Sequence, residues 1–382
     1  MANTAPLHGI RVIEIAGLGP APFCGMLLAD MGAEVLLIER AGGKSSAPLE
    51  LGRHAIFNRG KRSIALDLKN PEGVDAVLRL VATADVLIEG MRPGVMERLG
   101  LGPDACLARK PSLVYGRMTG WGQDGPLAQA AGHDLNYIAL SGALWYSGQA
   151  GTAPLAPPTL VGDLGGGALY LAMGVLAAVL HARGTGQGQV VDAAIVDGSA
   201  NLMNLLLSLQ SAGQMPDARG QGLLDGPHWY GSYRCACGGF VTLGALEPPF
   251  YALLLERLGL SEDADFQHPY DPRRWPALRE RFNQLFATQS RDHWVRLLEG
   301  TDACFAPVLT PAQAQTHPHL AARQVYVTQD GVLQAAPAPR FSTQPPAAIK
   351  PIPQRGSDGM AVLREAGFTE AEIIQLQSGP GF

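Results

Sequence analysis

The sequence predicts an α/β protein, with a large domain built on a Rossmann-like parallel sheet and a smaller α+β domain. Three observations predict this architecture. Short runs of Val, Ile and Leu alternate with stretches of helical periodicity between Arg11 and Arg117. A glycine-rich turn follows the first run, as in folds that bind ligands at the carboxyl ends of parallel strands. From about residue 227 the pattern changes to short strands followed by helices, and 382 residues suffice for two domains.

The large domain begins with a βαβ unit. Residues 11–16 predict a strand, residues 21–31 a helix with an apolar stripe, and residues 34–39 a second strand. A long loop follows at residues 41–62. Further strands are expected at 63–68, 85–89, 113–117 and 190–195, and further helices at 71–82, 164–180 and 198–211. Because strands alternate with helices, the sheet is expected to be parallel.

The change of pattern also predicts the domain boundaries. The large domain spans residues 1–212 and is completed by residues 325–382, residues 213–226 form a linker, and the small domain spans residues 227–320. Strands of the small domain are expected at 233–235 and 240–243, and its helices at 249–258, 275–287 and 290–298. A last helix at residues 357–378 is expected to return to the large domain.

Composition excludes several classes of function. The formal net charge of −5, from 29 Lys plus Arg against 34 Asp plus Glu, argues against general nucleic-acid binding. Five scattered cysteines predict reduced thiols rather than a disulfide scaffold, and no metal site is expected because Cys235 and Cys237 lack the two-residue spacing of zinc pairs. Residues 1–6 have neither a basic region nor an apolar run, so the cytoplasm is the expected compartment.

One apolar segment has the length of a short membrane span. Residues 164–180 carry no charge. The segment follows Asp163, however, and three of its first four residues are glycines. We therefore expect a core helix rather than membrane insertion.

Two stretches suggest proton-transfer chemistry. His133 is followed directly by Asp134, which places a carboxylate beside a side chain that exchanges protons near neutral pH. Asp163 precedes three glycines where a ligand could approach the backbone closely. A structural histidine and an Asp163 that caps a helix are the alternative interpretation.

The turn at residues 17–22 supports a different function. It matches a dinucleotide-binding fingerprint until its third glycine, which is replaced by Pro22, and Glu39 follows at about the spacing of the ribose-binding acid. A nicotinamide-dependent dehydrogenase therefore stays open as a distant alternative.

Seven motifs spread over nearly the whole chain resemble one known family. They occupy residues 9–14, 33–40, 58–63, 89–94, 120–126, 132–167 and 186–198. The family is the class III coenzyme A transferases (CaiB/BaiF). The Gly-His-Asp-x-Asn-Tyr sequence at residues 132–137 is similar to the racemase branch of this family, because the transferases typically lack the histidine but keep the residue equivalent to Asp163.

The resemblance implies an α/β fold in which two chains interlock as linked rings. It also implies an acyl-CoA substrate, and no cofactor because CoA is part of that substrate. The implied reaction is epimerisation of a 2-methylacyl-CoA at its α-carbon, by deprotonation to an enolate and reprotonation. The alternative within the family is CoA transfer between carboxylic acids through an acyl intermediate on Asp163.

The resemblance also assigns roles to residues. His133, assisted by Asp134, and Asp163, held by Glu247, are the predicted bases for the two faces of the α-carbon. Backbone groups of the glycines are predicted to stabilise the enolate oxygen, and arginines are predicted to bind the CoA phosphates. The glycines are Gly165, Gly166 and Gly167, and the arginines are Arg40, Arg59, Arg92 and Arg98.

Overall fold

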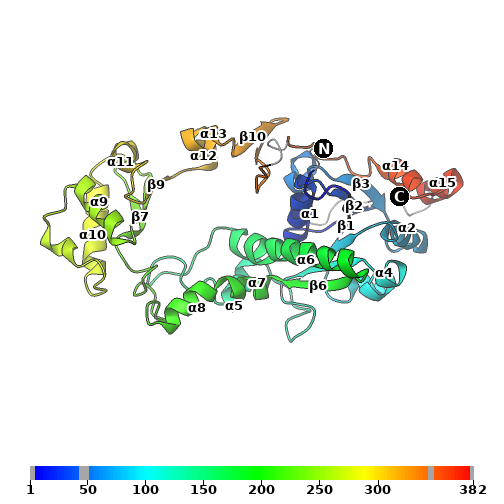
Figure 1. The fold of residues 1–382 in the computed structure, drawn as a ribbon, viewed down its shortest axis with the longest axis horizontal. Helices are drawn as coiled ribbons and strands as arrows, with labels where there is room; N and C mark the ends of the chain where they lie inside the picture. The colour runs from blue at the N-terminus through cyan, green and yellow to red at the C-terminus, as the bar shows by residue number, and fades with distance from the viewer. Residues whose placement is uncertain (1–4, 43–50, 343–347, 379–382) are drawn as a thin grey trace. The chain divides into compact units, whose positions relative to one another are not determined.

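The computed structural model describes residues 5–42, 51–342 and 348–378 (Figure 1). The chain divides into two compact units. The large unit contains Met1–Gly142, Pro157–Leu202 and Tyr326–Phe382, and the small unit contains Ala143–Ala156 and Met203–Val325. The predicted α/β class is confirmed, with a six-stranded parallel sheet and small antiparallel sheets. The exact domain boundaries and the interlocked dimer stay predictions.

The sheet of the large unit is doubly wound. Its strands are β1 (Arg11–Ile15), β2 (Glu34–Arg40), β3 (Arg62–Leu66), β4 (Val86–Glu89), β5 (Val114–Thr119) and β6 (Gln189–Ala194). All five pairings are parallel, in the order β3-β2-β1-β4-β5-β6. The order reverses between β1 and β4, so a crevice for ligands is expected at the carboxyl ends of these two strands.

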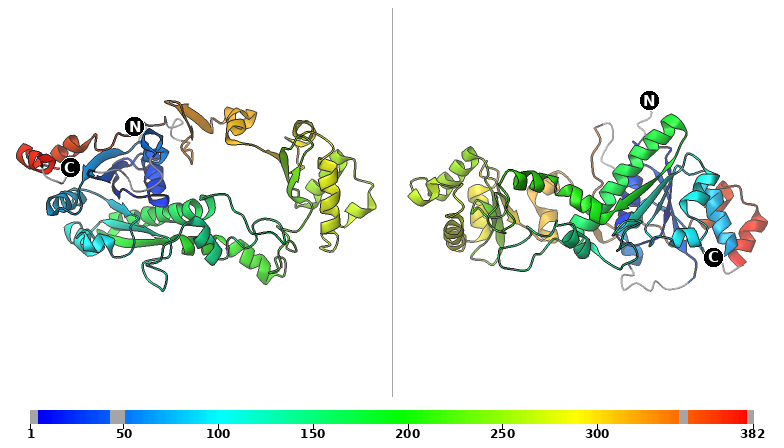
Figure 2. Two further views of the ribbon diagram at one scale, coloured as in Figure 1. Left: turned by 180° about the vertical axis from the view of Figure 1, so that it is seen from behind. Right: turned by 90° about the horizontal axis from the view of Figure 1, so that it is seen from below.

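Helices cover both faces of the sheet, as Figures 1 and 2 show. Neighbouring residues of β1 point to opposite faces: Val12 packs with the helices α1 (Pro20–Asp30) and α6 (Leu169–Thr185), and Ile13 packs in a second core. That second core also takes in α2 (Pro71–Val81), α4 (Pro103–Arg109), α14 (Gly359–Glu365) and α15 (Glu370–Ser378). The chain end therefore packs on the sheet.

Two predicted helices are wrong in extent. Residues 357–378 form α14 and α15 instead of one helix, because Gly367 takes a left-handed φ of 80° and Thr369 then caps α15 through its hydroxyl, which accepts the N–H of Glu372 at 3.3 Å. The helix predicted at 198–211 is divided into α7 (Ile195–Leu202) and α8 (Asn204–Ser211). This division coincides with the boundary between the two units.

The small unit has a three-stranded antiparallel sheet. Its strands are β7 (Tyr230–Arg234), β8 (Phe240–Gly244) and β9 (Phe305–Val308), of which β9 was not expected. Its helices are α9 (Pro248–Leu258), α10 (Trp275–Phe286), α11 (Arg291–Leu298), α12 (Pro311–Thr316) and α13 (Pro318–Ala322). Stacked aromatic rings, such as Phe266 on Phe282 with centroids 5.2 Å apart, fill the core between sheet and helices.

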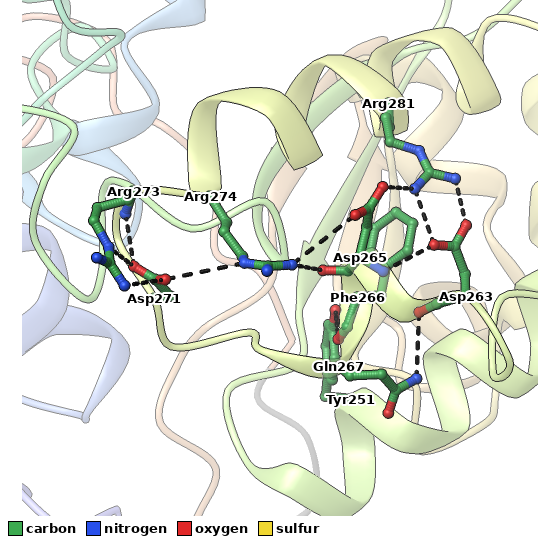
Figure 3. Close-up of polar contacts among 9 residues, drawn as sticks. All are labelled: Tyr251, Asp263, Asp265, Phe266, Gln267, Asp271, Arg273, Arg274 and Arg281. Atoms are coloured by element: carbon green, nitrogen blue, oxygen red, sulfur yellow. Dashed lines mark hydrogen bonds and ion pairs between the residues drawn. The ribbon is translucent and has the colours of Figure 1, made fainter.

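A network of ion pairs lies on the surface of the small unit (Figure 3). Arg281 contacts Asp263 at 2.5 Å and Asp265 at 3.0 Å, and its guanidinium lies 4.7 Å from the centre of the Phe266 ring. The charges of the network neutralise one another. It therefore offers no free cation to an anionic ligand, and such exposed pairs contribute only about 0–1 kcal/mol each.

The remaining elements are short. They are η1 (Gly52–His54), η2 (Ile56–Asn58), α3 (Val95–Arg98), α5 (Asp134–Leu140), η3 (Leu160–Ala168), η4 (Ala264–Gln267) and the antiparallel hairpin β10 (Tyr326–Gln329) with β11 (Val332–Ala335). The loop predicted at 41–62 contains η1 and η2, and its residues 43–50 lie outside the described part of the chain.

The apolar segment predicted as a core helix forms η3 and α6. Within the described ranges one helix, Leu160–Thr185, is long and apolar enough to cross a membrane by length and composition. Only 44% of its most apolar window is buried. One face of α6 packs on the sheet, whereas Leu169, Met173 and Leu180 on the other are 51%, 60% and 74% exposed. An exposed apolar face of this kind is typical of interaction sites.

Candidate active site

Asp163 lies in η3, a π-helix that leads into α6. Thr159 has a left-handed φ of 62°, and the N–H of Leu164 then donates to the carbonyl of Thr159 at 3.1 Å, which is the five-residue spacing of a π-helix. Segments of π-helix are rare and occur frequently at functional sites. The unusual backbone places Asp163 in the first turn, where its side chain is half-buried.

Asp134 holds the start of this π-helix. Its Oδ1 accepts the backbone N–H groups of Gly162 at 2.9 Å and of Asp163 at 2.8 Å. A Cβ built on Gly162 would lie 2.6 Å from the same oxygen, so the position requires glycine. These hydrogen bonds position Asp163. The sequence predicted only that Asp134 assists His133.

His133 precedes α5, the short helix that begins at Asp134. Its backbone N–H donates to the side chain of Asn136 at 3.1 Å, which fixes the chain at the start of the helix. The imidazole is exposed. The His133–Asp134 segment and Asp163, 30 residues apart in the sequence, therefore meet at one place.

The pKa of Asp163 reflects these surroundings. Burial and, to a smaller extent, the charge of Asp134 raise the pKa of this carboxyl group from its ordinary 3.8 to about 6, against the opposing effect of His133. A carboxyl group with a pKa near 6 can both release and accept a proton close to neutral pH. The arrangement thus suits a proton carrier rather than a permanently charged side chain.

Tyr137 completes the cluster, although the sequence interpretation gave it no role. Its hydroxyl donates to the carbonyl of Gly132, and its ring packs edge-on against Trp121 with centroids 4.7 Å apart. A Cβ on Gly120 would lie 2.1 Å from the Tyr137 ring, and one on Gly132 would lie 2.7 Å away. The ring therefore holds the backbone directly before His133. In the sequence, Gly120 and Gly132 are the residues that could have indicated this close packing.

The residues that follow β1 and β4 lie beside this cluster. A Cβ built on Gly19, which follows β1, would lie 3.7 Å from Asp163 Oδ2. Arg92 follows β4, and its charge lowers the pKa of Tyr137, which burial and the charge of Asp163 raise. The carboxyl ends of both central strands therefore reach the Asp163 cluster, as the sheet topology predicts.

The three glycines after Asp163 allow close packing. A Cβ on Gly166 would lie 2.5 Å from Ser199 Oγ of α7, and one on Gly167 would lie 3.3 Å from Pro20 Cβ of α1. Gly165 also leaves little room, because its Cβ would lie 3.1 Å from the carbonyl of Leu160. Packing alone explains these glycines, so the contribution of their backbone to enolate stabilisation stays a prediction.

The four predicted CoA-binding arginines fall into two groups. Three of them have exposed side chains: Arg40 at the end of β2, Arg92 shortly before α3, and Arg98, the last residue of α3. Arg59 is 3% exposed. The first three are therefore accessible to a ligand, and Arg59 is held inside the large unit.

Arg59 already has protein partners. Its guanidinium contacts the two carboxylate oxygens of Asp30 at 3.1 and 2.6 Å, and it donates to Gln334 at 3.0 Å and to the carbonyl of Ala335 at 2.7 Å. These contacts join η2 to β11 of the C-terminal hairpin. A direct contact of Arg59 with phosphate stays a prediction that these bonds do not favour.

Glu247 lies in the small unit, directly before α9, with an exposed side chain. Burial, and to a smaller extent the charge of Glu247, raises the pKa of Tyr270. The predicted contact between Glu247 and Asp163 stays a prediction. Within the part of the chain that the structure describes, no cluster of three or more His, Cys, Asp or Glu side chains could hold a metal ion.

Comparisons with known proteins support chemistry on a thioester. The profile of CoA-transferase family III matches residues 7–359. Two α-methylacyl-CoA racemases align over 375 residues, that of Mus musculus at 43% and that of Homo sapiens at 40% identity, and each alignment covers 97% of this chain and 96% of the relative. A crystal structure of a CaiB/BaiF family protein from Brucella suis superposes with a TM-score of 0.79 at 26% identity, covering 95% of this chain and 100% of that chain.

Proposed function

The chain belongs to CoA-transferase family III, as its motifs predicted, and we propose that it is an isomerase that epimerises 2-methylacyl-CoA thioesters at the α-carbon. Family membership and the two similar racemases support either racemisation or CoA transfer. The observation that favours racemisation is the meeting of His133 with Asp163, whose pKa is raised to about 6. Two proton carriers at one place are what inversion of a carbon requires.

The proposed reaction uses one carrier on each face of the α-carbon. One of His133 and Asp163 removes the α-proton as a base, and the other delivers a proton to the opposite face as an acid. Asp134 keeps Asp163 in place through the two backbone N–H groups that it accepts. Each direction of the reaction therefore uses the same two residues with their roles exchanged.

The enolate oxygen needs positive groups between the two carriers. We propose the backbone around Gly165, Gly166 and Gly167 and the N-terminal end of α1 at Gly19 for this role. Glu247 is proposed to share a proton with Asp163, which would raise one pKa of that pair further because like charges repel.

Solvent exchange tests the reaction. In heavy water, either enantiomer of a 2-methylacyl-CoA should gain deuterium at the α-carbon and yield both epimers, without a second carboxylic acid and without an added cofactor or metal. If no deuterium enters but CoA moves to an added carboxylate, the enzyme is a transferase. A change in nicotinamide absorbance would instead indicate a dehydrogenase.

The raised pKa predicts the pH dependence of racemisation. In the active enzyme one of His133 and Asp163 carries a proton and the other does not. At low pH both are protonated, so kcat/KM falls. The acidic limb should lie near pH 6, the pKa of Asp163, rather than near its ordinary 3.8. Both directions must show the same limb, because pH does not change the equilibrium between epimers. A limb at about pH 4 would show that Asp163 does not titrate as described.

The exposed position of Arg92 predicts its effect on substrate binding. Arg92→Ala should raise KM roughly ten-fold or more and change kcat little, because one charge-assisted contact with a phosphate contributes about 1.5–3 kcal/mol. Steady-state kinetics would measure this. The matched control is Arg109→Ala, which removes an exposed arginine of the same unit that pairs with Asp75 at 3.7 Å. A lower kcat at unchanged KM would contradict the binding role.

We propose that a second copy of the chain covers the exposed face of α6. Leu169, Met173 and Leu180 form an apolar stripe that water would otherwise contact. Met173→Lys should therefore yield a monomer in light scattering, and it should lose racemisation if Glu247 acts across the dimer. A wild-type chain that is monomeric and fully active would contradict this proposal, and partitioning into vesicles would favour a membrane as the partner of α6.

A further inference from the structure

A buried ion pair lies against α1, the helix that follows β1. Lys61 Nζ is 2.8 and 2.7 Å from the two oxygens of Glu14, and both side chains are fully buried. The ammonium group also donates to the carbonyl of Pro22 at 3.0 Å and to Asn58 at 3.4 Å. No step of the proposed reaction uses these residues.

The pair stands directly under α1. A Cβ built on Gly25, a buried residue of this helix, would lie 1.8 Å from Glu14 Oε2 and 3.2 Å from Lys61 Nζ. Glycine is unfavourable inside a helix, so its presence at this position has a structural reason. The absence of a side chain at Gly25 lets the backbone of α1 pack directly against the Glu14 and Lys61 side chains.

The bond from Lys61 to Pro22 holds the first turn of α1, which adjoins Asp163. This turn starts at Gly19, whose built Cβ lies 3.7 Å from Asp163 Oδ2, and Pro20 packs against Gly167 of η3. A displacement of the turn would therefore change the surroundings of the Asp163 carboxyl group. It would also expose the carboxyl group to water.

The cost of burying charges indicates that the pair is not present for stability. Desolvation raises the pKa of Glu14 and lowers that of Lys61, so each charge is unfavourable without the other. Replacing a buried ion pair by apolar side chains of similar volume is often neutral or stabilising, whereas removing one partner is strongly destabilising. A net gain in stability therefore does not explain the pair, whereas its contacts with Pro22 and Gly25 tie it to α1.

We propose that the Glu14–Lys61 pair is a positioning element of the active site, which holds the first turn of α1 against η3 and thereby fixes Asp163. This inference rests on the proposed function, because it assigns Asp163 a role in proton transfer. Glu14 and Lys61 act through α1, so they are positioning residues and not catalytic ones.

The double variant Glu14→Leu with Lys61→Met distinguishes an effect on the position of Asp163 from an effect on the stability of the fold. It should unfold close to the wild-type temperature, since no charge is left unpaired. Its kcat should fall about ten- to a hundred-fold at little-changed KM, as expected for a misplaced reacting group. The acidic limb of kcat/KM should move below that of the wild type, because Asp163 becomes more hydrated while Asp134, His133 and Tyr137 remain in place.

The control changes a neighbouring ion pair that is partly exposed. Glu365→Gln removes one of the two carboxylates that pair with Arg62, the one at 2.6 Å, and should leave kcat and the pH profile unchanged. A folded double variant with wild-type kcat and acidic limb would overturn the proposal. If the double variant does not fold, Asn58→Leu replaces it as the test, because it removes only the peripheral contact of Lys61. It should lower kcat and move the acidic limb of kcat/KM in the same direction as the double variant. Wild-type values of both would overturn the proposal.

Failure of the proposed function would be visible separately. If the wild-type enzyme neither racemises nor exchanges the α-proton, the function is wrong. The positioning of Asp163 is then measured directly, by NMR titration of its carboxyl group, which is assigned by comparison with Asp163→Asn. An unchanged titration in the double variant, or in Asn58→Leu if the former does not fold, would overturn the inference, and a lower midpoint would support it.

Discussion

Asp163→Asn should lower the rate of racemisation about 10²- to 10⁴-fold in both directions, because an amide can neither accept nor release the α-proton. The substitution keeps the shape of the side chain. It also keeps the backbone N–H groups that Asp134 accepts from residues 162 and 163, so η3 should stay folded. Chiral analysis of the CoA ester from each enantiomer measures the effect, and circular dichroism checks the fold.

The same variant distinguishes the two activities of the family. If Asp163 carries a proton, the variant should still exchange deuterium into the enantiomer whose α-proton faces His133. If Asp163 instead forms an acyl intermediate, its loss should stop transfer, and the wild-type enzyme should form an intermediate that hydroxylamine cleaves. Racemisation at the wild-type rate in Asp163→Asn would refute the assignment of Asp163 as a proton carrier.

The central strands of the parallel sheet could be predicted from the sequence because they are buried. The runs at 34–39 and 85–89 are nearly continuous apolar segments, as expected for strands that are covered on both faces. Helices with a cap and an apolar face, such as α2 after Asn70, were predicted to within a residue or two. These elements are specified locally, so their signal does not depend on the rest of the chain.

Elements specified by tertiary contacts could not be predicted in this way. The π-helix at η3 depends on the left-handed Thr159 and on the carboxylate of Asp134, which comes from a distant part of the sequence.

The division at Gly367 had a local signal, since Thr369 and Glu372 form a capping pair after a glycine. That signal was missed.

The site followed the same rule. Residue type and family resemblance selected His133 and Asp163, but neither revealed that Asp134 binds the backbone of η3. The contact of Tyr137 with Gly120 and Gly132 also joins positions that only the fold brings together. Charge and chemistry are therefore visible in the sequence, whereas the groups that position them mostly are not.

His133→Ala should abolish inversion while leaving proton exchange on one enantiomer. The exposed imidazole makes no packing contribution comparable to that of Tyr137, and the backbone N–H of residue 133 can still donate to Asn136. Asp163 is then the remaining carrier. It should remove the α-proton from the enantiomer that it faces and return a deuteron from heavy water to the same face.

The stereochemistry of exchange makes this prediction specific. His133→Ala and Asp163→Asn should label opposite enantiomers, each with retention of configuration, because each variant keeps the base of one face. His8→Ala, a change at an exposed histidine shortly before β1, is the matched control and should racemise normally. Deuterium content and chirality of the recovered thioester give the result. If His133→Ala retains full racemisation, a second acid must serve that face, and His133 is only the residue that precedes α5.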